Sequence, residues 1–298
     1  MTLAKAAAPA RAIPATPEAL LQAVLAANQA EDPRIHAILD SLIRHLHAFV
    51  ADTRLNYDEL QRGLDFMVRV GQATHPLRHE GILLADILGV ATLVLLMDAK
   101  AVLAAGGTEP ALIGPFWRDK QPLLANGSRI ATPDTQGQPL LVLGRVVSID
   151  GSPIAGAEVE VWQAAPSGLY ENQDPEQEDM NLRAVFRSDD DGRFWFESVK
   201  PAGYGVPIDG PCGELLALQK RDHMRPAHVH FIASAAGHKV LTTQIFDAND
   251  PYAYSDAAFG AVGSLLRRFE PSADGTYRLE VELKLEPGET RMPRPPLA

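Results

Sequence analysis

The chain has 298 residues, of which 46% are apolar, and a net charge of −11 from 27 basic and 38 acidic side chains. This composition is typical of a folded protein with a sizeable core, and the acidic balance argues against a nucleic-acid partner, which needs a basic face. Cys212 is the single cysteine, which excludes an internal disulfide, a cysteine-ligated zinc site and an iron–sulfur cluster. Any metal must therefore be held by His, Tyr or carboxylate side chains.

The first part of the chain predicts a tail followed by helices. Residues 1–16 are rich in Ala and Pro and lack the apolar core of a signal peptide, so we expect a flexible tail on a cytoplasmic protein. From residue 17 to residue 105, apolar side chains recur every three or four positions, and Thr16 and Asn56 stand where helices would be capped. We therefore expect a helical region over 17–105.

The most apolar stretch is ILLADILGVATLVLLM, at residues 82–97. It is too short for a confident membrane span and carries Asp86 in its middle. A single buried helix is the favoured interpretation, and we expect no membrane span.

From residue 106 onward the pattern changes to short runs that alternate apolar and polar residues. The turn dipeptides Asp150-Gly151 and Asp191-Gly192 lie between such runs. The runs occupy residues 140–148, 157–162, 192–197, 227–232 and 276–285. Many short strands with regular turns indicate a sandwich or barrel. The predicted class is α+β, with an N-terminal helical region followed by an all-β sandwich over 106–298.

Several common catalytic motifs are absent from the sequence. There is no GxGxxG, no phosphate-binding GxxxxGK[ST], no GxSxG and no HExxH, so nucleotide-binding folds, α/β-hydrolases and zincins have no support. Cys212 lies in a loop-like stretch, where a passive apolar role is favoured over a nucleophilic one.

The histidine pair in His228-Val229-His230 is the most informative local pattern. Residues i and i+2 of a strand point to the same face, so both imidazoles can reach one point while Val229 packs on the opposite face. Taken alone, the pattern fits a metal-binding pair and a pair of surface histidines about equally.

Two tyrosines lie in glycine- and proline-containing loop settings. Tyr170 follows Gly168-Leu169, and Tyr204 stands between Gly203 and Gly205. Hard trivalent iron prefers anionic oxygen and would deprotonate a coordinating phenol. The residues alone leave two possibilities open, namely metal ligands and half-buried loop anchors.

Five short motifs, taken together and in order, resemble the intradiol ring-cleaving dioxygenases. They are Gly168-Leu169-Tyr170, Asn181-Leu182-Arg183, Gly203-Tyr204-Gly205-Val206-Pro207, Arg225-Pro226-Ala227-His228-Val229-His230 and Leu241-Thr242-Thr243-Gln244. The resemblance covers most of residues 80–270. It implies one non-haem Fe(III) per subunit, a helical dimerisation region and a β-sandwich catalytic domain. It also implies a ligand set of Tyr170, Tyr204, His228 and His230.

The resemblance implies cleavage of an aromatic diol between its two hydroxyls, with both atoms of O2 incorporated. Tyr204 would be the ligand that the substrate displaces, and it would then help to take up a substrate proton. Gln244 offers an amide donor or acceptor and matches a position that would orient a cyclic anhydride intermediate or the tyrosinate. Arg225 has its own physical rationale, because a fixed guanidinium stabilises developing negative charge in a dry pocket. The alternative for Arg225 is a surface salt bridge.

Asp86 is the feature on which we base the substrate prediction. With Leu83 it lies on one face of the apolar helix, where a carboxylate is unfavourable unless it is paired or used. It could accept a hydrogen bond from a third ring hydroxyl, or it could be a buried Asp bonded to backbone or Arg. Because the segment resembles enzymes that cleave hydroxyquinol (benzene-1,2,4-triol), we predict that substrate and a muconate-type product, a maleylacetate precursor. Catechol or a chlorinated catechol is the alternative substrate.

The rest of the pocket and the partners complete the expectations. The expected apolar lining consists of Leu112, Ile113, Gly114, Pro115, Phe116, Val206 and Pro207. Apolar helix faces predict a homodimer through the N-terminal region, and the resemblance adds a possible lipid at the dimer seam. The competing class is a non-enzymatic β-sandwich that binds small aromatics, which would be colourless, whereas an iron–tyrosinate enzyme would be red-brown.

Overall fold

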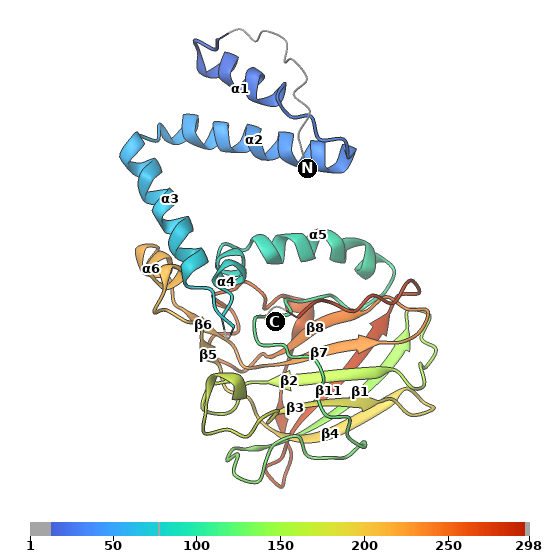
Figure 1. Ribbon diagram of the computed structural model, residues 1–298. Helices are drawn as coiled ribbons and strands as arrows, with labels where there is room; N and C mark the ends of the chain where they lie inside the picture. The colour runs from blue at the N-terminus through green and yellow to red at the C-terminus, as the bar shows by residue number, and fades with distance from the viewer. Residues whose placement is uncertain (1–12, 77, 296–298) are drawn as a thin grey trace. The chain divides into compact units, whose positions relative to one another are not determined.

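The structure is a computed structural model that describes residues 13–76 and 78–295 (Figure 1). The chain divides into two compact units, Met1–Phe66 and Met67–Ala298. Each unit is described by itself below.

The first unit is helical, as predicted. It contains α1 (Pro17–Leu25), α2 (Pro33–Thr53) and the beginning of α3 (Tyr57–Gln72). Thr16 Oγ1 accepts a hydrogen bond from the Ala19 amide at 3.2 Å, and Asn56 Oδ1 accepts one from the Glu59 amide at 3.0 Å. Both predicted caps are therefore confirmed, because each side chain satisfies an amide that the first helical turn leaves unpaired.

One face of α2 carries a row of exposed apolar side chains. Their exposed fractions lie between 44% and 54% in Ile35, Ile38, Leu42, Leu46 and Phe49. The positions recur every three or four residues, so they form one stripe along the helix. No residue of α2 is buried by the described part of the chain.

The second unit begins with the end of α3 and continues into two helices, where one expectation was wrong. The apolar run 82–97 is not a single helix but is divided between α4 (Glu80–Ile87) and α5 (Val90–Ala104). Gly89 separates them with a φ of 70°, a left-handed conformation that glycine adopts easily. Among the described residues no single helix is long and apolar enough to cross a bilayer, and α4 and α5 reach that length only as a pair bent by 67°.

Two sheets form the sandwich that the alternating runs predict. One sheet has the strand order β10-β11-β1-β4 and the other β3-β2-β7-β8-β9. The bounds are β1 (Pro139–Ser148), β2 (Glu158–Gln163), β3 (Arg183–Arg187), β4 (Arg193–Val199), β7 (His228–Ser234), β8 (Leu241–Asp247), β9 (Leu266–Arg267), β10 (Glu270–Pro271) and β11 (Tyr277–Leu285). All five predicted runs are strands, shifted at their ends by no more than two residues.

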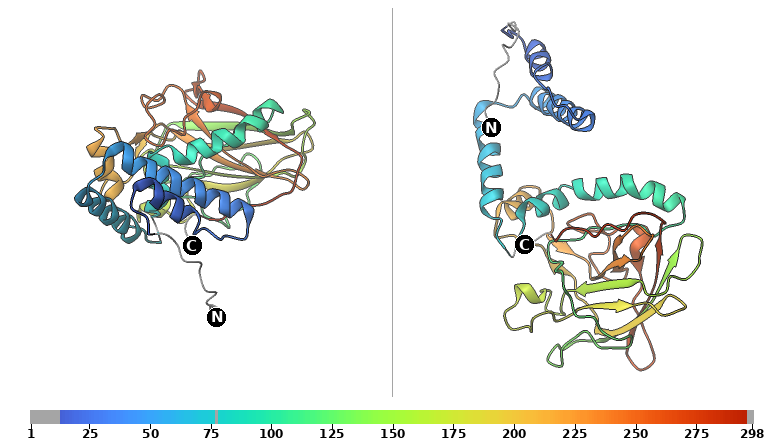
Figure 2. Two further views of the ribbon diagram at one scale, coloured as in Figure 1. Left: turned by 90° about the horizontal axis from the view of Figure 1, so that it is seen from above. Right: turned by 45° about the vertical axis from the view of Figure 1, so that its right-hand side comes forward.

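The core of the sandwich is built from the inward positions of both sheets. Val142 on β1 and Phe196 on β4 face Val229 and Phe231 on β7, and all four are fully buried. β1 pairs with β11 in parallel and with β4 antiparallel. In both Figure 1 and Figure 2, α5 lies across one side of this sandwich.

Smaller elements lie outside the two main sheets. They are the 3₁₀ turn η1 (Glu171–Gln173), a two-stranded ladder of β5 (Tyr204–Gly205) and β6 (Met224–Arg225), α6 (Pro211–Leu218) and η2 (Gly263–Leu265). Two expectations are corrected here, because Tyr204 begins a short strand and Cys212 is buried in a helix, not in a loop. Gly205 permits the ladder, since a Cβ at that position would overlap the His223 ring.

Candidate active site

β7 brings the two histidines together as the period of a strand requires. His228 Nε2 and His230 Nε2 lie 3.1 Å apart, and both side chains are almost fully buried. Val229 points to the opposite face and joins the sandwich core. The surface-pair interpretation of this motif is therefore wrong.

The phenol oxygens of both tyrosines lie beside this histidine pair. Tyr170 Oη lies 2.9 Å from His230 Nε2, 3.5 Å from His228 Nε2 and 3.4 Å from Tyr204 Oη. Tyr170 is 1% exposed and Tyr204 6%. Four donor atoms thus converge on one point, from the residue that precedes η1, from β5 and from β7, and neither tyrosine is a half-buried loop anchor.

The four donors have the spacing of a metal site. Ligand atoms that each lie about 2.1 Å from one ion stand roughly 3 Å from one another, close to the separations seen here. Two phenol oxygens and two imidazoles form a donor set that suits a hard trivalent ion such as Fe(III). Within the described ranges, no group of three or more His, Cys, Asp or Glu side chains could hold a metal. The residues present therefore fit a mononuclear iron centre.

The outer nitrogens of both imidazoles are held in place. His228 Nδ1 lies 2.7 Å from the Pro226 carbonyl oxygen, to which it can donate, leaving the Nε2 lone pair directed at the other donors. The His230 ring stacks on Trp162 with centroids 4.4 Å apart, and Gln244 Nε2 lies 3.2 Å from its Nδ1. These partners leave each ring little freedom to turn away from the centre.

Burial sets the protonation of this cluster. Desolvation, assisted by the charge of Arg225, lowers the pKa of His228 to about 3, and desolvation lowers the pKa of His230 as well. Both imidazoles are consequently neutral near pH 7 and have a lone pair for a metal. Burial, with Tyr204 adding to it, raises the pKa of Tyr170. A nearby cation would be required to hold Tyr170 as a phenolate.

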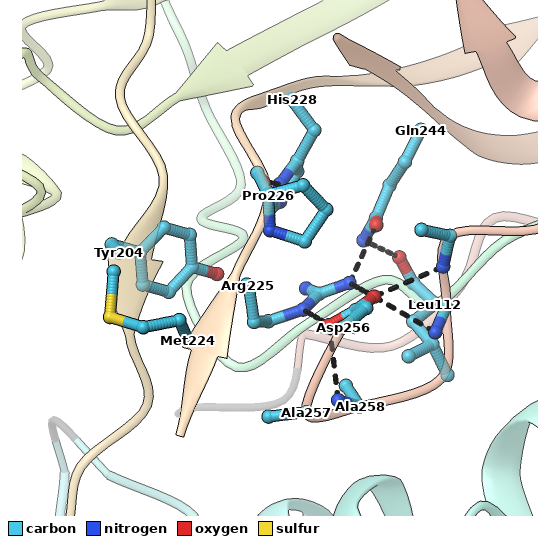
Figure 3. A network of polar contacts seen from close by, with 12 residues as sticks. Leu112, Tyr204, Met224, Arg225, Pro226, His228, Gln244, Asp256, Ala257 and Ala258 are labelled. Atoms are coloured by element: carbon cyan, nitrogen blue, oxygen red, sulfur yellow. Dashed lines mark hydrogen bonds and ion pairs between the residues drawn. The ribbon is translucent and has the colours of Figure 1, made fainter. Parts of the chain in front are cut away.

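Arg225 is a buried residue of the site and not part of a surface salt bridge. It is 3% exposed, and its Nη2 donates to Gln244 Oε1 at 3.1 Å (Figure 3). Gln244 in turn donates from Nε2 to the Leu112 carbonyl oxygen at 2.5 Å. Burial is the largest single effect and disfavours the guanidinium charge, but Asp256, Tyr204 and Tyr170 together outweigh it, so the pKa of Arg225 is raised. The site thus contains a permanent, fixed positive charge.

Asp256 is a functional residue that the sequence did not reveal. Its carboxylate accepts from Arg225 and also from the amides of Ala258, Gly260 and Ala261, at 2.9 to 3.0 Å. Burial is the largest single effect and would raise the pKa of Asp256, but Arg225, together with the Ala258 amide and His228, outweighs burial and lowers the pKa. No motif marks this loop, and the only available signal was an acidic residue among small ones.

A cavity of about 400 Å³ opens beside the donors. Six of the nine expected pocket residues line it, namely Leu83, Asp86, Pro115, Phe116, Val206 and Pro207, together with the predicted catalytic residues Tyr204 and Arg225. It is also lined by residues that were not expected, namely His75, Arg78, His79, Leu169, Asn172, Gln173, Gly205, Asp209 and Ala258. A larger cavity of about 820 Å³, beside β11 and the end of α5, includes none of the four donors.

Three expected pocket residues lie elsewhere in the described part of the chain. Leu112 contributes its carbonyl to Gln244, and Ile113 packs beside the aromatic cluster around Tyr170. Gly114 approaches His230, whose Cε1 would lie 3.4 Å from a Cβ at that position. These residues support the histidine and glutamine side chains, and their contact with a substrate stays a prediction.

Asp86 faces the cavity as an unusual buried carboxylate. It is 6% exposed, and across residues 13–76 and 78–295 no side chain or amide donates a hydrogen bond to it. Burial raises the pKa of Asp86 to about 6, opposed by the smaller effect of Arg225. The interpretation as a buried Asp bonded to backbone or Arg is therefore not supported by the described residues.

Comparison with known proteins agrees with the motifs. Residues 112–287 match the family model described as "Dioxygenase", and residues 32–106 match "Catechol dioxygenase N terminus". The chain is 41% identical to the 6-chlorohydroxyquinol 1,2-dioxygenase of Cupriavidus pinatubonensis, over 90% of this chain and 96% of that protein. It is also 41% identical to the hydroxyquinol 1,2-dioxygenase of a Rhizobium species, over 84% of each.

A solved structure shows the same fold. The hydroxyquinol 1,2-dioxygenase of Pseudomonas putida superposes with a TM-score of 0.81 and 36% identity, covering 91% of this chain and all of that one. Sequence and structure thus agree over both the helical region and the sandwich. The chain therefore belongs to the intradiol ring-cleavage dioxygenase family.

Proposed function

We propose that this protein uses O2 to cleave hydroxyquinol between its adjacent 1- and 2-hydroxyls, giving a muconate-type dicarboxylate. The observation that carries the substrate assignment is the position of Asp86. Its carboxylate lines the same cavity as Tyr204 and Arg225 and accepts no hydrogen bond from the described residues. Hydroxyquinol has one hydroxyl more than catechol, and this hydroxyl could donate to Asp86.

Tyr170, Tyr204, His228 and His230 would hold a non-haem Fe(III) ion. The ion would act as a Lewis acid and template for the diol. Tyr204 lines the cavity, whereas Tyr170 does not and is buried more completely. This difference supports Tyr204 as the tyrosine that an incoming diol can reach and replace, with its phenolate oxygen taking up a substrate proton.

Arg225 and Gln244 would act on the charge that develops in the substrate. The Arg225 guanidinium lines the cavity and is fixed by Asp256, so it can stabilise negative charge on the ring without reorganising. Gln244 joins Arg225 to His230 and therefore fixes the charged group relative to a ligand. This connection through Gln244 keeps the distance between the Arg225 charge and the His230 ligand constant during the reaction.

Asp86 would select the triol. A site built to bond a substrate hydroxyl rejects the analogue that lacks it, because a buried polar group is then left without its partner. Apolar walls around Asp86, from Leu83, Pro115, Phe116 and Val206, would hold the flat ring. Those walls alone would also accept catechol or a chlorinated catechol, which is the alternative substrate class.

The test is a comparison of kcat/KM for hydroxyquinol and catechol with the iron-loaded protein. We expect a preference for hydroxyquinol, and a preference for catechol would overturn the substrate assignment. A colourless protein that binds both compounds without consuming O2 would instead indicate the aromatic-binding alternative.

We further propose that the apolar stripe on α2 is covered by a second copy of this chain. Five large apolar side chains exposed by about half are unfavourable in water and form a continuous stripe. A homodimer through this stripe would cover the same residues in both copies. A lipid at the seam stays a prediction from the family resemblance.

A further inference from the structure

The Arg221 guanidinium joins two segments that each contribute a residue to the cavity wall, namely Asp86 and Ala258. Its Nη1 donates to the carbonyl oxygen of Ile87 at 2.5 Å, and its Nη2 donates to the carbonyl oxygen of Ala257 at 2.8 Å. Nη1 also lies 3.1 Å from Gln219 Oε1. Arg221 itself does not line the cavity.

The two carbonyls belong to neighbours of the charged groups in the cavity. Ile87 directly follows Asp86 at the end of α4, and Ala257 directly follows Asp256, which holds Arg225 through two hydrogen bonds. A planar guanidinium presents its donors in a fixed fork. Arg221 thereby sets the separation between the backbone that carries Asp86 and the backbone that anchors Arg225.

Further contacts join the loop at residues 257–259 to the junction between α4 and α5. Phe259, a non-glycine residue with a φ of 55°, places its ring 4.5 Å from the Arg221 guanidinium carbon. That ring also lies 3.4 Å from the position of a Cβ on Gly89, at the break between α4 and α5. Thr92 Oγ1 on α5 donates to the Ala258 carbonyl at 3.2 Å. Phe259 is 49% exposed, so its left-handed backbone depends on these few contacts to hold it in place.

We propose that Arg221 is a positioning residue for substrate selection: it fixes the Asp86 carboxylate at the distance from Arg225 that the third hydroxyl of a triol requires. The inference rests on the proposed function, because it assigns Arg221 a role only through Asp86. Catechol does not use Asp86, so its turnover should depend much less on Arg221. A hydroxyl-specific contact is sensitive to small displacements, of the order of 1 Å.

The test uses two substitutions of Arg221. Arg221→Met keeps an apolar stem over Phe259 and removes both donors, and Arg221→Lys restores one charged donor. We expect Arg221→Met to lower the hydroxyquinol-to-catechol ratio of kcat/KM by about ten-fold, with catechol kcat/KM changed by no more than about three-fold. Arg221→Lys should give an intermediate ratio. An unchanged visible iron–tyrosinate band would show that the metal site is intact.

Arg267→Met is the matched control. Arg267 also donates to two backbone carbonyls, those of Ser264 at 2.9 Å and Leu266 at 2.8 Å, but it is exposed and does not line the cavity. Its substitution should leave the ratio unchanged. A second measurement repeats Arg221→Met in an Asp86→Asn background, where we expect no further fall in the ratio.

Three kinds of result overturn the inference. If the wild-type protein prefers hydroxyquinol but Arg221→Met keeps the ratio, or lowers both activities equally, the positioning role is wrong and the proposed function stands. If the ratio falls as far in the Asp86→Asn background, Arg221 does not act through Asp86. A wild-type protein without preference for hydroxyquinol would overturn the substrate assignment and the inference with it.

Discussion

The Arg225 guanidinium and the Asp256 carboxylate form a two-point ion pair inside the protein. Nε lies 2.9 Å from Oδ1 and Nη2 lies 3.1 Å from Oδ2, and the two side chains are 4% and 3% exposed. A buried pair of this kind does not by itself show net stabilisation, but it is strongly unfavourable to break. Here its effect is to keep one positive charge at a fixed place in the cavity wall.

Asp256→Ala should both destabilise the protein and impair catalysis. It leaves the Arg225 charge without its counterion and three loop amides without their acceptor, so we expect a loss of about 3 kcal/mol in the free energy of unfolding. kcat should fall by at least about ten-fold, because the guanidinium is no longer fixed. Urea unfolding and steady-state kinetics measure the two effects. Asp191→Ala removes an exposed pair with Arg193 and should change stability by less than about 1 kcal/mol; equal effects of the two substitutions would contradict the account.

Asp86 should give stability a distinct dependence on pH. Burial raises its pKa from 3.8 to about 6, so the folded state binds the proton more tightly than the unfolded state does. Its contribution to stability is therefore complete below about pH 4 and is lost as pH rises through about 6. Asn cannot ionise, so the free energy of unfolding of Asp86→Asn should rise by about 1 kcal/mol relative to that of wild type as pH increases from 5 to 8.

Urea unfolding at pH 5 and pH 8 measures this difference. Asp98→Asn, on the exposed side of α5, is the control. Its free energy of unfolding should differ from that of wild type by the same amount at pH 5 and at pH 8. If the difference in free energy of unfolding between Asp86→Asn and wild type is the same at both pH values, Asp86 is not a buried, unpartnered carboxylate.

Tyr204→Phe should change the visible spectrum of the iron-loaded protein. The substitution removes one of the two phenolate donors while keeping the ring, so the charge-transfer band should shift and weaken. Tyr254→Phe is the matched control, because Tyr254 is 85% exposed and belongs to no site described here. Absorption spectra at equal iron content give the comparison. An unaltered band in Tyr204→Phe would exclude this tyrosine as a ligand.

A charge placed on the apolar stripe of α2 should separate the proposed dimer. Leu46 is 54% exposed and belongs to the stripe, so Leu46→Glu should shift the protein from dimer to monomer at micromolar concentration. Ala48 is exposed on the same helix but lies outside the stripe, and Ala48→Glu should leave the assembly unchanged. Sedimentation measures both variants. If Leu46→Glu and Ala48→Glu dimerise equally tightly, the interface does not include this stripe.

The local patterns predicted the strands and the histidine pair because a strand places alternate residues on one face. That rule positions His228 and His230 without knowledge of the fold, and it also places Val229 in the core. The two tyrosines needed the family resemblance, since nothing within either segment specifies that Tyr170 and Tyr204 meet.

Features that depend on distant segments could not be predicted in the same way. Asp256 reaches Arg225 from 31 residues further along the chain, through a loop without any motif. Gly89 ends a helix inside a run whose apolar side chains would suit one continuous helix. In both cases packing against distant segments decides the structure, and the neighbouring residues in the sequence do not specify that packing.

The claim that Asp86 selects a triol is tested most directly by the ratio of kcat/KM for hydroxyquinol to that for catechol, measured side by side in wild type and Asp86→Leu. Leu fills a similar space and offers no acceptor. We expect the wild-type ratio to exceed one and to fall by about a hundred-fold in the variant. A ratio that is the same in both proteins would contradict the account.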